Sequence, residues 1–351
     1  IAANKIRGVP LLPSGYSIVQ GYLIGPNVDL YGARIINANL SNLDLSDAVL
    51  TGAVLTGSNL SNTDLSGALL VRLSAVGANF TGSDLTRANL SRSTLSQSNF
   101  ELASLEDADF GGATITNADF SNATFIGIKS GKLSGIPKFL PIGYVVRNGY
   151  FVGEDADLTN ANLTEATLTG VNLTSARLSG VRSGKIKGMP QLPDGFTMIE
   201  GYIVGPNANL TSAVLPRKLM QNMNLTGVNL TAAVIDGTDF TGSILRFGNL
   251  SKSSAKGTKF QNAVLDDAFF ASAELQSASF FGANMKRTNL YGASIFGATF
   301  TDAKFTNTIC PSGAVSSVMC APLPTSTKTA TRTRTPARTN TIPRRTATPK
   351  R

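Results

Sequence analysis

An apolar residue at every fifth position is the feature that most constrains how this chain can fold. The pattern runs unbroken from Leu30 to Phe125 and again from Leu210 to Phe305, twenty positions in each run. A period of five fits neither an α-helix, which repeats about every 3.6 residues, nor a flat strand, which repeats every two. The chain must therefore be built from a repeating unit that stacks on itself, and duplication of one long array is the simplest account of the two runs.

Each unit has the order small residue, Asn or Asp, Leu or Phe, Ser or Thr, and a variable residue, as residues 78–82 show. We call the Leu or Phe the central residue. A narrow interior that admits one medium apolar side chain per unit explains this order, because stacked units then form ladders of like residues. Asn and Asp bond readily to nearby backbone amides, which suits a tight corner. We expect the following central residues to lie in the core ladder: Leu40, Leu60, Phe80, Phe100, Phe120, Leu210, Leu230, Leu250, Phe270 and Leu290.

This order of residues resembles the pentapeptide-repeat family, over 45 units and about 225 residues. The resemblance implies an all-β fold, a right-handed quadrilateral β-solenoid with four units in each coil. It also implies that the central and small residues point inward, that Asn or Asp sits at the corner, and that Ser/Thr and the variable residue face outward.

Three related segments punctuate the repeats at residues 6–26, 133–153 and 186–206, and we call them the Pro-Gly segments. Each combines a Pro-Gly turn with two short extended pieces, and an aromatic residue follows each Gly, which suggests a ring lying over exposed backbone. We expect these segments to be irregular coils of one rod; a hinge between independent rods is the alternative. The predicted modules are residues 1–128 (Pro-Gly segment and first long array), 129–181 (Pro-Gly segment and short array), 182–308 (Pro-Gly segment and second long array), 309–324 (a Cys-containing cap) and 325–351 (a disordered Thr/Pro/Arg tail).

The two cysteines, Cys310 and Cys320, follow the second long array. We expect a structural disulfide that closes the rod; two free thiols in a reducing compartment are the alternative. The tail carries eight basic residues and no acidic one, so it predicts a linker that also contacts an anionic surface or wall polymer. The remaining chain has 23 basic and 22 acidic residues and is nearly neutral. The chain begins with Ile1 rather than Met, from which we expect a processed or excised product.

The sequence predicts no catalytic residue, no cofactor and no metal, and therefore that the chain is not an enzyme. There is no histidine to serve as general base or metal ligand, and two cysteines cannot build a zinc cluster. The acidic patches at 106–109 and 266–267 are expected to be solvated faces, with a weak calcium site as the alternative. No Gly-rich phosphate loop precedes a helix, and no apolar run approaches the roughly 18 residues of a transmembrane segment.

A neutral rod with polar faces, a terminal cysteine pair and a Thr/Pro-rich tail favours a non-catalytic structural protein: a cell-surface, sheath or filament component, or a spacer. The Pro-Gly segments and the ending at residues 308–313 resemble exported bacterial pentapeptide-repeat proteins, which implies an extracellular or cell-surface location. Poorly capped rods would self-associate end to end.

Two other functions are weighed against this one. The first is a flat-face binder of a glycan, wall polymer or ice through ladders of hydroxyls such as Ser41, Ser46 and Thr51. The second is DNA mimicry, by which some pentapeptide-repeat proteins bind topoisomerases. This function is less favoured, because mimicry of DNA needs a strongly acidic rod and this one is nearly neutral. No specific nucleic acid partner is expected, because no aromatic residues interleave the basic residues of the tail.

Overall fold

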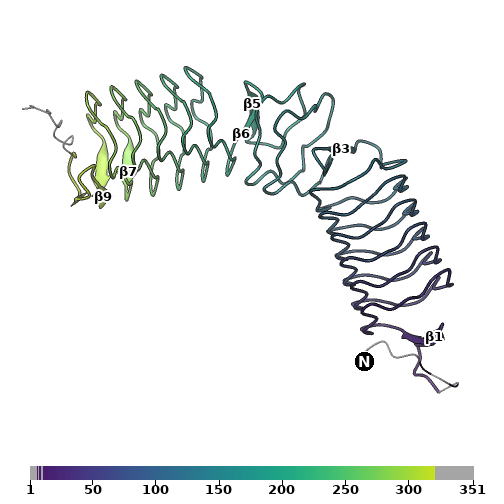
Figure 1. The fold of residues 1–351 in the computed structure, drawn as a ribbon. Helices are drawn as coiled ribbons and strands as arrows, with labels where there is room; N and C mark the ends of the chain where they lie inside the picture. The colour runs from purple at the N-terminus through teal and green to yellow at the C-terminus, as the bar shows by residue number, and fades with distance from the viewer. Residues whose placement is uncertain (1–5, 7, 9–10, 321–351) are drawn as a thin grey trace, which may run out of the picture.

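The computed structural model describes residues 6, 8 and 11–320. This part of the chain contains no helix, and it forms two arms of stacked coils that meet at a bend (Figure 1). The first arm runs from the N-terminal end to the region of β3 (Val145–Arg147), and the second from β6 (Tyr202–Val204) to β9 (Thr308–Ile309). The fold is therefore an all-β repeat fold. None of its described elements is a helix that could cross a membrane.

Parallel bridges join residues twenty positions apart along both arms. Asp29 pairs with Val49 at the start of the first arm, and Asn289 pairs with Ile309 near the end of the second. Because a bridge recurs every five residues, one turn of the chain holds four units.

The bridge residues of the first arm consequently form four columns, which we name A to D in chain order. Column A begins at Asp29, column B at Arg34, column C at Asn39 and column D at Asp44. Each column then continues at every twentieth residue.

The core consists of central residues inside the coils, in two buried clusters that divide between Ile203 and Val204. The ten predicted ladder residues all lie in it, each with at most 1% of its surface exposed. Phe100 stacks between Phe80 and Phe120, with ring centroids 4.7 and 5.0 Å away. Alanines of the small position, such as Ala103, fill the space between the central residues.

The corners of the coil are β-turns, and the residues that form them differ from the expectation. In one unit the amide of Ser58 donates to the carbonyl of Leu55 at 3.0 Å, and Gly57 between them has a φ of 66°. The corner is thus made by the Ser/Thr and the variable residue. Asn59 lies beyond it in the straight bridge segment, so the placement of Asn or Asp at the corner is wrong. Its Oδ1 instead accepts the amide of Ser61 at 3.1 Å, which fixes the start of the next corner.

Hydroxyls at the small position are buried and bonded. Several Ser and Thr hydroxyls here donate to a backbone carbonyl of the preceding coil, as from Ser58 to Ile35 at 2.7 Å and from Thr63 to Leu40 at 2.8 Å, while those of Ser83 and Ser253 donate to a carbonyl of their own coil. The narrow interior therefore accepts a small polar side chain without leaving a buried donor unpaired.

Each Pro-Gly segment contains a two-stranded antiparallel hairpin. The pairs are β1 (Ser17–Val19) with β2 (Tyr22–Ile24), β3 with β4 (Tyr150–Val152), and β5 (Thr197–Ile199) with β6. Both turn residues have positive φ in every copy, 49° and 76° at Asn148 and Gly149, as two-residue type I′ turns require.

The aromatic rings of the Pro-Gly segments cover glycines, as the sequence suggests. A Cβ placed on Gly25 would lie 2.3 Å from the ring of Tyr16, and one on Gly205 would lie 2.4 Å from Phe196. The ring therefore occupies the space of the missing side chain and closes the hairpin against the coil.

The stack continues through the second and third Pro-Gly segments along a single column each. Lys129 pairs with Asp157 across the second segment and Arg182 with Asn209 across the third, at separations of 28 and 27 residues instead of 20. Within residues 11–320 no other bridge crosses these two junctions. The hairpins occupy other sides of the coil, and the bend in Figure 1 lies at these two segments.

The second arm ends in a short capped segment. β7 (Asn284–Lys286) pairs in parallel with β8 (Lys304–Thr306), and β9 pairs antiparallel with β10 (Val315–Ser316). Cys310 and Cys320 form a disulfide with a Cα–Cα distance of 5.3 Å, and both are buried. The predicted cap at 309–324 is described as far as residue 320, and the tail at 325–351 lies outside the described residues.

Candidate functional site

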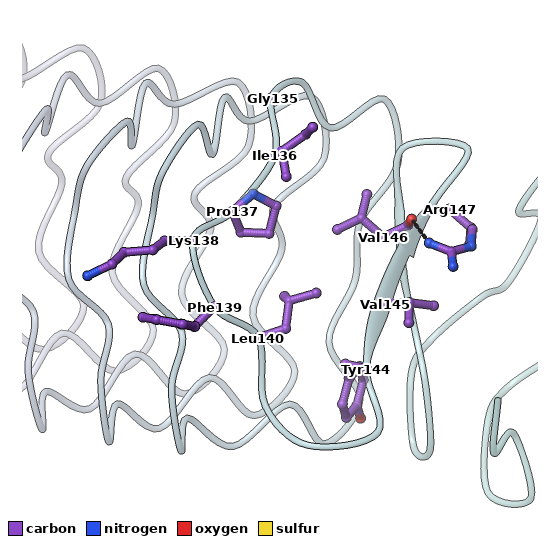
Figure 2. A pocket seen from close by; sticks show the side chains of 10 residues that line it. All are labelled: Gly135, Ile136, Pro137, Lys138, Phe139, Leu140, Tyr144, Val145, Val146 and Arg147. Carbon is purple, nitrogen blue, oxygen red and sulfur yellow. Dashed lines mark hydrogen bonds between the residues drawn. The ribbon is translucent and has the colours of Figure 1, made fainter. Parts of the chain in front are cut away.

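A groove at the bend lies between the segment 135–140 and strand β3 (Figure 2). Its volume is about 390 Å³. Most of the side chains around it are apolar, and the residues that line it are Gly135, Ile136, Pro137, Lys138, Phe139, Leu140, Tyr144, Val145, Val146 and Arg147.

The polar groups of this groove are engaged by the protein itself. Arg147 donates from Nη1 to the carbonyl of Val146 at 2.8 Å, drawn in Figure 2, and from Nε to the carbonyl of Thr167 at 2.9 Å. Lys138 points toward the first arm, where its Nζ lies 5.0 Å from the ring centroid of Phe139 and 3.9 Å from Asp119. Neither cation is left to orient a ligand.

Tyr144 is a titratable group of the groove whose pKa is shifted. Burial, with the carboxylates of Asp155 and Glu154, raises the pKa of the Tyr144 phenol above its ordinary value. Its hydroxyl lies within hydrogen-bond distance of the carbonyls of Phe125 and Glu154. The phenol therefore stays protonated and anchors the hairpin, so the groove offers shape and apolar surface but no general base.

A polar cluster beside the first junction is built around Arg177. Its Nη1 lies 3.6 Å from Asp107 of the first arm and 3.6 Å from Asp157 of the short array. Lys129 and Asp109 line the same depression. These ion pairs span the junction, and their geometry ties the two modules together.

Each acidic patch that raised the calcium alternative contains a carboxylate paired with a cation of the chain. Asp107 contacts Arg177, and in the second arm Asp267 accepts two hydrogen bonds of 2.6 Å from Arg287. The guanidinium of Arg287 lowers the pKa of the Asp267 carboxyl. Among the described residues no three His, Cys, Asp or Glu side chains gather as a metal site would require.

The hydroxyls that suggested a flat binding face lie elsewhere. Ser41 and Ser46 follow their central residues and fall in the corners, and Thr51 does the same. The hydroxyl of Ser41 donates to Asn39 at 2.8 Å and that of Ser46 to Asp44 at 2.6 Å. The expected ladder is therefore an edge of the coil, and part of it is already hydrogen-bonded.

Comparison with known families decides what kind of protein this is. Two family models, both described as pentapeptide repeats, match more than half of the chain: one at residues 29–67, 154–182, 207–246, 243–286 and 273–309, the other at residues 75–124. The chain belongs to the pentapeptide-repeat family. A search of curated proteins finds no match.

Solved structures of other pentapeptide-repeat proteins resemble it at low identity. HetL of the cyanobacterium Nostoc sp. strain PCC 7120, involved in heterocyst differentiation regulation, is 20% identical over 80% of this chain and 92% of its own, with a TM-score of 0.26. A protein of the Arabidopsis thaliana thylakoid lumen is 31% identical over 26% of this chain and 63% of its own, with a TM-score of 0.25. QnrB1, a plasmid-mediated fluoroquinolone resistance protein, is 13% identical over 76% and 88%, with a TM-score of 0.22. At these TM-scores no role is transferred from them to this pentapeptide-repeat protein.

Sequence reasoning did not find the groove or the Arg177 cluster. Both arise where a Pro-Gly segment interrupts the stack. The groove forms within that segment, and the cluster joins Asp107, Asp157 and Arg177 from distant parts of the chain. The weak signal available was the departure from the twenty-residue spacing between Lys129 and Asp157.

Proposed function

We propose that this pentapeptide-repeat protein is a non-catalytic structural rod, exported and used as a cell-surface, sheath or filament component or as a spacer. The observation that supports this proposal is that apolar residues fill the interior of the coils while polar residues lie on their outer surface. The interior holds central and small residues, and many outward polar groups are bonded in turns and ion pairs such as Arg287 with Asp267. We take the coil to be a right-handed quadrilateral β-solenoid.

Three features support export and assembly. The disulfide of Cys310 and Cys320 suits an oxidising compartment. The first Pro-Gly segment and the disulfide cap sit at the two ends, where imperfect cover would permit end-to-end stacking. The basic tail, with its eight positive charges, suits an anionic surface or wall polymer.

Negative-stain electron microscopy of the full chain, with and without reductant, tests the assembly. Long filaments of arm width indicate a polymer, and a change on reduction assigns the contact to the disulfide cap. Separate bent particles at every concentration indicate a spacer.

Surface labelling tests export. An antibody against the second arm should label intact cells of the source organism, and a chain ending at residue 320 should be released from anionic wall material at lower salt than the full chain. Labelling only after lysis would contradict the exported role.

A further inference from the structure

Charges on the first arm are separated between opposite sides. Face B, which we define as column B with its two corners, contains no Asp or Glu and four basic residues. Face D, column D with its two corners, contains seven acidic residues and one basic residue, Arg87. Face B comprises residues 31–37, 51–57, 71–77, 91–97, 111–117 and 131–137. Face D comprises residues 41–47, 61–67, 81–87, 101–107 and 121–127.

The basic residues of face B are free of ion pairs. Arg34, Arg72, Arg92 and Lys132 are all exposed, and none of them contacts an acid of the described chain. Successive coils rise by roughly 4.8 Å, so these charges follow the arm as a stripe.

The acids of face D are similarly unpaired. Of the seven, Asp107 alone has an ion pair, with Arg177. The others are Asp44, Asp47, Asp64, Asp84, Glu101 and Glu106. The stripe of face D therefore has the opposite sign to that of face B and runs parallel to it from the coil of Arg34 to that of Arg92.

The second arm handles its charges differently. Lys259 lies 3.5 Å from Asp239, Lys256 lies 2.7 Å from Glu274, and Arg287 bonds Asp267, each across neighbouring coils. Acids and cations are thus mixed on the same sides of the second arm, and several of them pair with each other. Segregation on the first arm is thus a property of that arm and not of the repeat.

We propose that the first arms of two copies associate side by side, with face B of one copy against face D of the next. Faces B and D are two units apart in a coil of four, so they lie on opposite sides and one copy can engage a neighbour on each. The contact is heterologous and extends as an open lateral array. It differs from end-to-end stacking and does not depend on export. An anionic polymer on face B would leave the acidic stripe of face D without a role, which favours a second copy.

The association is expected to be multivalent and sensitive to salt. A single exposed ion pair contributes little to the free energy of association, so the affinity between two copies must come from several pairs along the stripe. Raising the salt from about 10 mM to about 1 M shortens the screening length from roughly 30 Å to 3 Å and should abolish the contact. Sedimentation velocity of the full chain should show concentration-dependent growth at low salt alone.

Two charge variants test the faces separately. The face B variant is Arg34→Glu, Arg72→Glu, Arg92→Glu and Lys132→Glu. The face D variant is Asp47→Lys, Glu101→Lys and Glu106→Lys with Asp44→Asn, Asp64→Asn and Asp84→Asn. Both fit the coil, since Glu165 already occupies a corner with a φ of 62° and Asn59 already makes the turn bond of the bridge position.

Each variant alone should lower the association constant at least tenfold, and an equimolar mixture of the two should restore it, because reversed faces of one match those of the other. The matched control is Arg217→Glu, Lys252→Glu, Lys286→Glu and Lys304→Glu, four exposed cations of the second arm with the same change in net charge. It should associate like the unaltered chain.

The proposal is overturned by a monomeric chain at low salt, by a control that associates as weakly as the face B variant, or by a mixture of the two variants that stays monomeric. It is also overturned if the face B variant associates normally while the face D variant does not, since the basic tail would then be the partner of face D.

Discussion

The variable residue of each unit determines the geometry of the corner. It takes a positive φ, which Gly and Asn adopt at least cost, and these two residues are frequent there. Arg72, Arg92 and Leu102 nevertheless adopt φ values of 57°, 60° and 61°. The amide of Arg72 donates to the carbonyl of Ser91 in the next coil at 3.0 Å. Bonds between coils therefore hold residues in a conformation that they would otherwise avoid.

Leu102 provides a direct test of this cost. Its side chain is 61% exposed, so it gains little from packing. We expect Leu102→Asn to raise the free energy of unfolding by about 1 kcal/mol, since a left-handed conformation costs an ordinary residue roughly that much. Asn122→Leu, at the same corner one coil later with a φ of 57°, should lower it by a similar amount. Denaturant melts of both variants measure the effect, and changes of equal sign would contradict it.

Asp239 predicts an acid-sensitive second arm. Burial alone would raise its pKa, but hydrogen bonds from Thr241 and Gln221 and the charge of Lys259 together lower the pKa of this carboxyl. A lowered folded pKa means that the stabilisation is present above the unfolded value of about 3.9 and is lost as the pH falls through the folded pKa. Asp239→Asn keeps an acceptor for Thr241. It should lower the free energy of unfolding by about 1 kcal/mol at neutral pH and reduce the loss of stability as the pH falls.

The matched control for this prediction is Asp64→Asn. Asp64 accepts the corresponding turn amide from Ser66 at 2.9 Å but forms no ion pair. The substitution Asp64→Asn should lower the free energy of unfolding at neutral pH less than Asp239→Asn does. Thermal melts between about pH 2 and pH 7 compare the two variants, and parallel curves for Asp239→Asn and the unaltered chain would contradict the assignment.

At this scale the sequence predicts the core well and the corner poorly. A strict period of five identifies Leu60 and Phe80 as inward residues because burial has no other pattern to follow. The period cannot tell which of the remaining positions bends the chain. The side chain of Asn59 can accept a backbone amide whether Asn59 lies in the corner or in the straight segment before it. The preference for Asn at this position therefore does not tell the two placements apart.

Among the elements, the hairpins of the second and third Pro-Gly segments lie where the two arms meet. The tip of each of these hairpins packs back on the chain before it: the amide of Leu133 donates to the carbonyl of Gly149 at 3.0 Å, and that of Ile186 to Gly201 at 3.1 Å. The sequence predicts the two extended pieces from their Gly and Pro residues. It does not predict this return contact, which joins residues sixteen and fifteen positions apart within the segment.

Gly149 tests the contact between the hairpin tip and the arm. A Cβ there would lie 3.1 Å from the amide nitrogen of Leu133 and 3.2 Å from the Cα of Lys132, so backbone would have to move. We expect Gly149→Ala to destabilise the second Pro-Gly segment by about 2–3 kcal/mol. Gly143→Ala is the control, because Gly143 also has a positive φ, 86°, but nothing within 4 Å of its Cβ position. Hydrogen exchange of residues 129–157 should accelerate more in Gly149→Ala, and equal acceleration in both variants would assign the whole effect to φ.

For the whole molecule, the bend follows from how the Pro-Gly segments interrupt the stack. Column A alone passes the second segment and column B alone passes the third, while hairpins take up other sides of the coil. Where coils stay in contact along one column and are held apart by a hairpin on the other sides, the axis of the stack must bend toward the column that stays in contact. The sequence shows three Pro-Gly segments, but not which column each preserves, because that depends on how many residues the hairpin absorbs.

Removing the second and third Pro-Gly segments should therefore straighten the molecule. Replacing residues 130–156 by a copy of residues 110–128, and residues 183–208 by a copy of residues 163–181, restores a separation of twenty residues between Lys129 and Asp157 and between Arg182 and Asn209. All four columns could then pair across both junctions, as they do within the arms. We expect negative-stain images and small-angle scattering to change from two arms at an angle to one straight rod with a longer maximum dimension. Replacing one segment at a time should give intermediate angles, because each interrupts the stack at a different column. A chimera that keeps the original angle would place the origin of the bend in the arms themselves.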